Sequence, residues 1–451
     1  DNWQKFNGEQ TDPGDSTDFL VPQMVAPAST GYAIGSLADY FGLPTEVPDY
    51  THMSLAHRAY NLIWNEWFRD QNLQNSVVVD KDDGPDDPGD YSLLRRGKRH
   101  DYFTSCLPWP QKGPAVPLPL GTEAPIRGRK HDGTVSDNVY LEGLADPNDY
   151  YGTLKATTTK DVQLDTNSTI GSDSILRWQQ EGAGTGTDDF GYNYADLSEA
   201  TASTINALRQ AFQLQKLYER DARGGTRYTE IIRSHFGVTS PDARLQRPEY
   251  LGGGSSPINI HPIAQTSSTD ATTPQGNLAA MGTASTRGHG FSKSFTEHCI
   301  VLGMVNVRAD LNYQQGLNRM WSRQTRFEFY WPALSHIGEQ AVLNKEIYTQ
   351  GTSADDDVFG YQERYAEYRY KPSVITGKFR STSSTPLDIW HLAQEFGSLP
   401  VLGDTFIQDD PPMSRIKAVE TEPDFLFDAY FSYRCARPMP VYSVPGLIDH
   451  F

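Results

Sequence analysis

The chain has 451 residues, which is enough to bury a large core and excludes a disulfide-stapled miniprotein. Its formal net charge of -18 argues against a conventional binder of nucleic acid or of anionic membranes. The sequence contains no run of eighteen apolar residues, the length that a membrane-spanning helix needs. With 38 Gly, 29 Pro and 12% aromatic residues, the composition favours strands joined by long loops over a helical bundle.

Three helices are predicted from apolar residues at helical spacing. The first covers residues 54–71, with Ser54 as its N-cap. The second covers residues 198–223 and stops at a Gly-Gly pair, and the third covers residues 226–235.

Two polar segments lie between the predicted helices. Residues 80–90 form an acidic run broken by Pro and Gly, which predicts a solvated surface loop; the calcium-binding EF-hand pattern fails at Gly84 and Pro85. Residues 121–192 are rich in Gly, Thr, Asp and Asn and carry twelve acidic side chains against six basic ones. This stretch predicts a solvated insertion.

The C-terminal part of the chain has the patterns of strands. Apolar or aromatic residues run or alternate in four segments, at residues 298–307, 325–331, 361–370 and 425–435. Several such strands separated by very long loops favour a β-sandwich or a jelly roll.

The usual one-line enzyme signatures, such as GxSxG, HExxH, the P-loop and GxGxxG, are absent. The histidines that adjoin predicted helices or strands, His57 among them, fit hydrogen-bonded structural roles better than catalysis. Cys106, Cys299 and Cys435 are widely separated and odd in number, so we predict no disulfide framework, metal site or cofactor, and a reducing compartment. A glycosidase-type carboxylate pair stays open, because its separation is a three-dimensional quantity.

Two basic segments are flanked by aromatic residues, a combination that can neutralise phosphate and stack unpaired bases. The first cluster consists of Arg95, Arg96, Lys98 and Arg99. The second segment covers residues 205–247 and has four acidic side chains and eight basic ones. The basic residues are Arg209, Lys216, Arg220, Arg223, Arg227, Arg233, Arg244 and Arg247. We expect some of these residues to face DNA and others to bridge subunits or cap helices.

Residues 100–105 (HDYFTS) and 107–113 (LPWPQKG) resemble the signature of the major capsid protein of microviruses, the small single-stranded DNA bacteriophages, and specifically of the gokushovirus branch. Other stretches are similar to the same family in the same order, namely residues 1–8, 212–217, 219–228, 240–253 and 288–290. The resemblance reaches both ends of the chain and leaves out mainly residues 121–192. Because the chain starts at Asp1 and the family's proteins begin with a further segment, we expect sequence upstream.

The resemblance implies a mainly β fold, an eight-stranded antiparallel jelly roll of the viral capsid type with long loop insertions and a few short helices. Residues 1–120 are expected to form its first part, residues 121–192 a surface insertion that protrudes at the threefold axes, and residues 193–451 the rest. Tyr102, Phe103 and Trp109 are expected to be anchors, either at a subunit interface or between loops; an ordinary buried turn is an equal alternative for Trp109.

The resemblance also implies the function and the partners. Sixty copies, through pentamers, would form a T=1 icosahedral shell around a circular single-stranded DNA genome, without enzymatic activity or membrane insertion. The expected partners are a small basic DNA-associated packaging protein, a minor pilot protein and a host cell-surface receptor contacted by residues 121–192, with assembly in the bacterial cytoplasm and the virion as destination. The alternative is a carbohydrate-binding or carbohydrate-active β-sandwich protein that uses its exposed aromatic and acidic residues on sugars.

Overall fold

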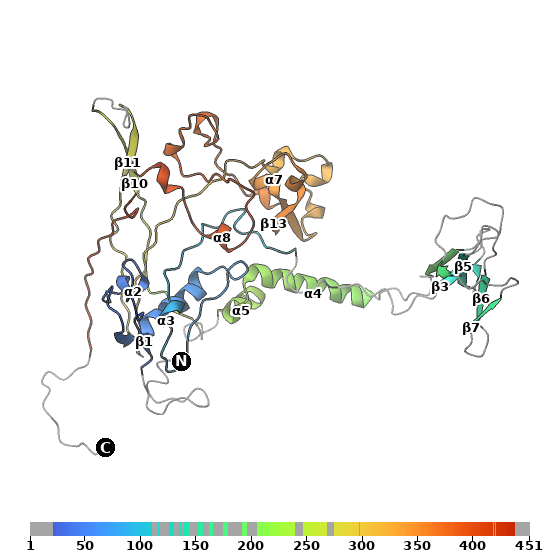
Figure 1. Cartoon of the computed structure of the whole chain (residues 1–451), viewed down its shortest axis with the longest axis horizontal. Coiled ribbons are helices and arrows are strands. Elements are labelled where there is room, and N and C mark those ends of the chain that lie inside the picture. Colours follow the sequence, from blue (N-terminus) through green and yellow to red (C-terminus); the bar gives the residue numbers. More distant parts are fainter. Residues whose placement is uncertain are drawn as a thin grey trace, which may run out of the picture. The chain divides into compact units, whose positions relative to one another are not determined.

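The computed structural model describes residues 21–110, 116, 205–239, 247–267, 275–296, 298–417, 419 and 421–437, together with the backbone of seven short strands between residues 126 and 195 (Figure 1). By its internal contacts the chain divides into two compact units. The first comprises residues 1–110 and 241–451, and the second is the continuous stretch 111–240 between them.

The sheets described in the first unit are small, antiparallel and two-stranded. The pairs are β1 (Gln23–Val25) with β2 (Thr51–Met53), β10 (Asn259–Ala264) with β11 (Leu278–Thr283), and β12 (Glu339–Leu343) with β13 (Val358–Glu363). Its α-helices are α2 (Leu37–Tyr40), α3 (Leu55–Ile63), α7 (Asn344–Ile347) and α8 (Asp404–Ile407). Short 3-10 turns connect many of these elements.

The second unit contains two antiparallel sheets and two helices. The three-stranded sheet has the order β4-β3-β9 and the four-stranded sheet the order β7-β6-β5-β8. The strands are β3 (Ile126–Arg129), β4 (Val135–Ser136), β5 (Val139–Leu144), β6 (Gly152–Ala156), β7 (Val162–Asp165), β8 (Ile175–Trp178) and β9 (Tyr192–Ala195). The helices are α4 (Ile205–Gly224) and α5 (Tyr228–Phe236).

The first predicted helix is divided into two kinds of helix. After α3 the chain continues as a π-helix, η1 (Trp64–Phe68), which ends where Arg69 becomes extended. Ser54 is at the N-cap position, but its hydroxyl is not a cap: it is buried and donates to the carbonyl of Pro22. The predicted cap is corrected: Ser54 has helical backbone angles, φ -92° and ψ -7°, instead of the extended ones typical of an N-cap, and its hydroxyl makes no cap hydrogen bond.

The other two predicted helices are confirmed in their described residues. Helix α4 ends at Gly224, and Gly225 has a φ of 91°, a left-handed conformation that glycine adopts without strain. Helix α5 likewise ends before Gly237, at φ 69°. Residues 198–204 lie outside the described part of the chain.

The strand predictions for the C-terminal part are mostly wrong. Residues 298–307 and 425–435 contain no strand in the described structure, and β13 covers only the beginning of 361–370. Residues 325–331 form a 3-10 turn, because the carboxylate of Glu328 accepts the backbone N–H groups of Gln324 and Thr325 and closes the turn. An alternating pattern makes a strand only where a partner strand supplies hydrogen bonds.

Two hydrophobic clusters hold the first unit together. The larger joins Tyr102, Phe103 and Cys106 to residues more than 200 positions later, among them Val342, Ile347, Phe359 and Phe406. The smaller lies near the N-terminus and contains Met24, Tyr32, Leu37, Tyr60 and Tyr91. Both halves of the discontinuous unit are therefore needed to complete the larger cluster.

Candidate nucleic-acid and subunit interfaces

The segment that carries the capsid signature lies inside the larger cluster. Tyr102 and Phe103 are 6% and 5% exposed, and their rings pack edge to face with centroids 5.2 Å apart. Such a ring pair adds about 0.5–1.5 kcal/mol to the free energy of burial. Both residues pack against distant segments of their own chain, as the alternative of an anchor between loops describes. Trp109 is half-buried at the end of the segment.

A short hydrogen-bonded turn fixes this segment. The Asp101 carboxylate accepts the backbone N–H groups of Phe103 and Thr104, each at 2.8 Å. Leu107 then exchanges two backbone hydrogen bonds of 2.8 Å with Tyr361 on β13. The two aromatic rings thus enter the core from a rigid turn held at both ends.

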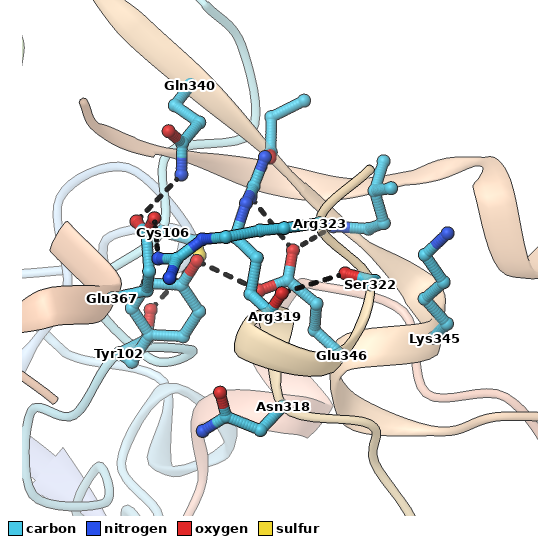
Figure 2. Close-up of polar contacts among 12 residues, drawn as sticks. Tyr102, Cys106, Asn318, Arg319, Ser322, Arg323, Gln340, Lys345, Glu346 and Glu367 are labelled. Atoms are coloured by element: carbon cyan, nitrogen blue, oxygen red, sulfur yellow. Dashed lines mark hydrogen bonds and ion pairs between the residues drawn. The ribbon is translucent and has the colours of Figure 1, made fainter. Parts of the chain in front are cut away.

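A buried polar network lies beside Tyr102 (Figure 2). The Tyr102 hydroxyl donates to Glu346 at 3.0 Å, and Arg319 forms an ion pair of 3.0 Å with the same carboxylate. Arg323 pairs with Glu367 at 3.1 Å, and both side chains are 8% exposed. Burial raises the pKa of Glu346, although Arg319 opposes this shift. Because Tyr102, Arg319 and Arg323 each contact a buried carboxylate, the network stiffens this part of the core.

The basic cluster at residues 95–99 is bound to the rest of its own unit. Arg95 and Arg99 form exposed ion pairs with Asp410 at 2.9 Å and Asp310 at 3.0 Å. Exposed pairs of this kind contribute little stability, so a phosphate could displace the carboxylate at modest cost. The guanidinium of Arg96 donates to the side chain of Asn306 and lies over the ring of Phe68.

Lys98 differs from its neighbours because it is buried, with 7% exposed. Its ammonium group donates to Gln394 at 2.9 Å and lies 4.2 Å from the centre of the Phe406 ring. Burial lowers the pKa of Lys98 to about 8, although three carboxylates oppose the shift. Lys98 is therefore a core residue and is not available to DNA in this conformation.

Helix α4 presents a basic stripe. Arg209, Lys216, Arg220 and Arg223 are seven, four and three residues apart, so their directions lie within about 60° of one another at 3.6 residues per turn. The first three are exposed and Arg223 is half-buried. In the following helix Arg233 is exposed, whereas Arg227 is held by Glu230 at 3.1 Å. Three of the four residues on the stripe are therefore open to solvent, as Arg95 and Arg99 also are.

Large apolar side chains are exposed in unusual number. The clearest example is the stretch 425–433, where Leu426, Tyr430 and Phe431 are 102%, 93% and 79% exposed. These residues lie outside any helix or strand. An exposed apolar segment of this length is typical of a surface that another protein chain covers.

Two negative findings concern the described residues. No group of three or more His, Cys, Asp or Glu side chains there could hold a metal ion. Among the helices that the structure describes, none is long and apolar enough to pass through a bilayer.

Comparison with known proteins decides the family. A family profile described as capsid protein (F protein) matches residues 1–447. The chain belongs to this capsid-protein family. The microvirus resemblance of the sequence is thereby confirmed, and the role of the chain is that of a structural major capsid protein.

Curated relatives of this capsid protein are named capsid protein VP1. The one from Bdellovibrio phage phiMH2K is 49% identical over 457 residues, covering 100% of this chain and 83% of its own length. Those from Chlamydia phage 1 and Spiroplasma virus 4 are 44% and 39% identical, covering 99% and 98% of this chain and 84% and 82% of their own lengths. The similarity thus extends over nearly all of this sequence, including the parts outside the described residues.

Proposed function

We propose that this capsid protein forms a T=1 icosahedral shell of sixty copies around a circular single-stranded DNA genome. The observation that carries the proposal is the 49% identity to a phage capsid protein over the full chain. The exposed apolar stretch 425–433 supports it, because shell contacts would remove these side chains from water. The protein acts structurally, as a part of the virion, and has no enzymatic activity.

The fold of the subunit in this proposal is an eight-stranded antiparallel jelly roll. Each strand pair described in the structure is antiparallel, as a jelly roll requires. Residues 299–312 and 425–437 run without helix or turn and offer further backbone for pairing within the shell. Hydrogen exchange of shells against free subunits tests this: amides of 425–435 protected in the shell would support the jelly roll, and rapid exchange in both would contradict it.

We assign host attachment to residues 121–192. The polar, acidic composition suits a solvated protrusion, and the alignment with the Chlamydia phage 1 relative is longer than this chain, so relatives differ by insertions. Replacing 121–192 by a short linker should leave particles that assemble but do not attach to cells. Loss of assembly in a folded subunit would contradict the assignment.

The genome contact is assigned to Arg95, Arg96, Arg99 and the basic stripe of α4. A subunit with a net charge of -18 cannot offset the phosphates of a packaged genome alone, which favours a small basic packaging protein as partner. A minor pilot protein and assembly in the host cytoplasm complete the proposal. Changing the three arginines together to Gln should weaken genome retention more at low salt than at high salt, because the contacts that are lost are the salt-sensitive ones; intact DNA content in broken shells would instead place them at subunit contacts.

Negative-stain imaging of the purified protein is the decisive test. Closed shells or pentamers would support the capsid proposal. Monomers or small oligomers that bind an oligosaccharide array would favour the alternative, a carbohydrate-binding protein.

A further inference from the structure

Two neighbouring aromatic residues on the π-helix each carry an arginine from a distant segment. The guanidinium carbon of Arg247 lies 3.8 Å from the centre of the Trp67 ring, and that of Arg96 lies 5.1 Å from the centre of the Phe68 ring. A π-helical turn is frequently found at functional sites. We call Trp67, Phe68, Arg96, Arg247 and Tyr250 the stacking platform.

The platform is held in place by hydrogen bonds rather than by chance proximity. The indole N–H of Trp67 donates to the carbonyl of Pro248 at 2.8 Å, and the Tyr250 ring lies 6.4 Å from that of Trp67. The Arg96 guanidinium donates to Asn306 at 3.0 Å. Residues 67–68, 96, 247–250 and 306 therefore meet at one place.

The platform is both open and cationic. Trp67 is 47% exposed and Tyr250 is 66% exposed. Among the described residues, Arg96 and Arg247 form no ion pair, and the Nε of Arg247 has no hydrogen-bond partner. Two acids adjoin the platform in sequence, Glu66 before Trp67 and Glu249 before Tyr250, and Glu249 forms an ion pair with Lys293 at 2.8 Å. Burial together with the charges of Arg308 and Arg99 lowers the pKa of Arg96, so further cations lie near.

This combination selects a ligand class. Exposed rings and a stacked guanidinium plane accept the flat face of an unpaired base, and unpaired arginines accept phosphate. A double helix keeps its bases stacked inside and cannot use the rings. An apolar neighbouring subunit would leave the two guanidinium groups without a counter-charge.

We propose that the stacking platform binds single-stranded nucleic acid, with a base stacked on Tyr250 and on the Arg247–Trp67 pair and phosphates bound by Arg96 and Arg247. The inference rests on the proposed function, because it places this face on the inner surface of the shell. It adds base stacking to a genome contact that the basic residues alone would make purely electrostatic.

The test uses the full-length subunit and a fluorescein-labelled dT12 oligonucleotide, followed by anisotropy. Tyr250→Ala should raise the Kd for dT12 by roughly 5- to 100-fold, the range for loss of one base–aromatic stack. Tyr250→Phe should stay within about twofold, because it keeps the ring. The matched control is Tyr40→Ala, which removes a ring that is 72% exposed on α2 and should change nothing.

Two further measurements separate stacking from charge. Binding of a 12-bp duplex should be the same for wild type and Tyr250→Ala, since paired bases cannot stack on the ring. Arg247→Gln should lower the slope of log Kd against log salt by about 0.7, the value for one lost phosphate contact on a single strand. Thermal melting of each variant verifies that the fold is intact.

The proposal is overturned if Tyr250→Ala and Arg247→Gln both bind dT12 with the affinity of the wild-type protein. It is also overturned if they bind dT12 normally but no longer form shells, because the platform is then a subunit contact. Failure of the shell proposal would be recognised independently of these binding measurements, because the wild-type protein itself would then form no closed particles.

Discussion

The carboxylate of Asp86 is fully buried and receives the guanidinium of Arg58, whose Nε donates to it at 2.7 Å. The Tyr91 hydroxyl donates to the same group at 2.8 Å. Burial by itself would raise the pKa of Asp86, but the hydrogen bonds from Arg58, Ser54 and Tyr91 lower it. The pair ties helix α3 to the acidic loop and contacts the smaller core cluster through Tyr91.

Asp86→Asn should destabilise the subunit by about 3–5 kcal/mol, because it leaves a buried guanidinium without its charge partner. The matched control is Asp82→Asn, which alters the second carboxylate on Arg58; this side chain is 77% exposed, so its loss should cost less than about 1 kcal/mol. Denaturant unfolding of the two variants compares them directly. Equal losses would mean that burial does not decide the strength of these pairs.

Because His57 is buried in its neutral form, we expect the free energy of unfolding to fall in mild acid. Burial lowers its pKa to about 4, helped by His52 and opposed by Asp86, and the rings of Phe41 and Tyr91 pack against it. Its ring nitrogens have no hydrogen-bond partner among the described residues, which corrects the expected hydrogen-bonded role. Between the unfolded pKa of about 6.5 and the folded value, the unfolded state binds the extra proton.

The free energy of unfolding should therefore fall by up to about 3 kcal/mol as the pH drops from about 6.5 to 4, with no further contribution from His57 below that range. His57→Phe should remove this part of the slope while keeping the edge-to-face ring contacts. Urea titrations at several pH values measure both proteins. An unchanged slope in the variant would assign the acid sensitivity to other groups.

Lys98→Met should be at least as stable as the wild type at pH 7, because it avoids the burial of a charge and keeps a side chain of similar length. In the wild type, stability should rise as the pH increases from about 8 to 10.5, since only the unfolded state keeps the proton there. The Lys98→Met variant should lack this rise in stability, and its shells should contain as much DNA as wild-type shells. Reduced DNA content in stable shells would show that Lys98 reaches the genome after all.

Gly316→Ala should cost about 3 kcal/mol or more, or prevent folding. A Cβ at this position would lie 2.0 Å from the carbonyl oxygen of Glu346, a backbone atom that cannot move without displacing α7. Gly397→Ala is the control, since a Cβ there meets nothing within 4 Å. Melting temperature and soluble yield compare the two substitutions. Equal melting temperatures and soluble yields for the two variants would mean that the backbone around Gly316 can shift to accommodate a Cβ atom.

Local features could be predicted from the sequence, and long-range pairings could not. The end of α4 depends on a Gly-Gly pair and was predictable at the residue level. Asp86 was expected in a solvated loop, because its partner Arg58 lies 28 residues earlier and nothing in the local pattern marks it. The alternating run 325–331 failed as a strand for a related reason: a local carboxylate cap competed with a partner strand and prevailed.

In the candidate site, too, local features could be predicted and long-range contacts could not. The sequence shows the basic clusters directly, but the burial of Lys98 depends on Phe406 and Gln394, about 300 residues later. The stacking platform was missed because its members come from separate segments, although Arg247 was among the basic residues noted. An aromatic pair within a predicted helix, followed later by isolated arginines, was the only signal available.

The discontinuity of the first unit sets the order of events during synthesis. Tyr102 and Phe103 leave the ribosome long before Phe406, their partner in the larger cluster, and the second unit is made in between. At about 5–20 residues per second, these rings wait roughly 15–60 s for completion of their core. A nascent subunit therefore spends most of its synthesis with the rings of Tyr102 and Phe103 without the partners that bury them.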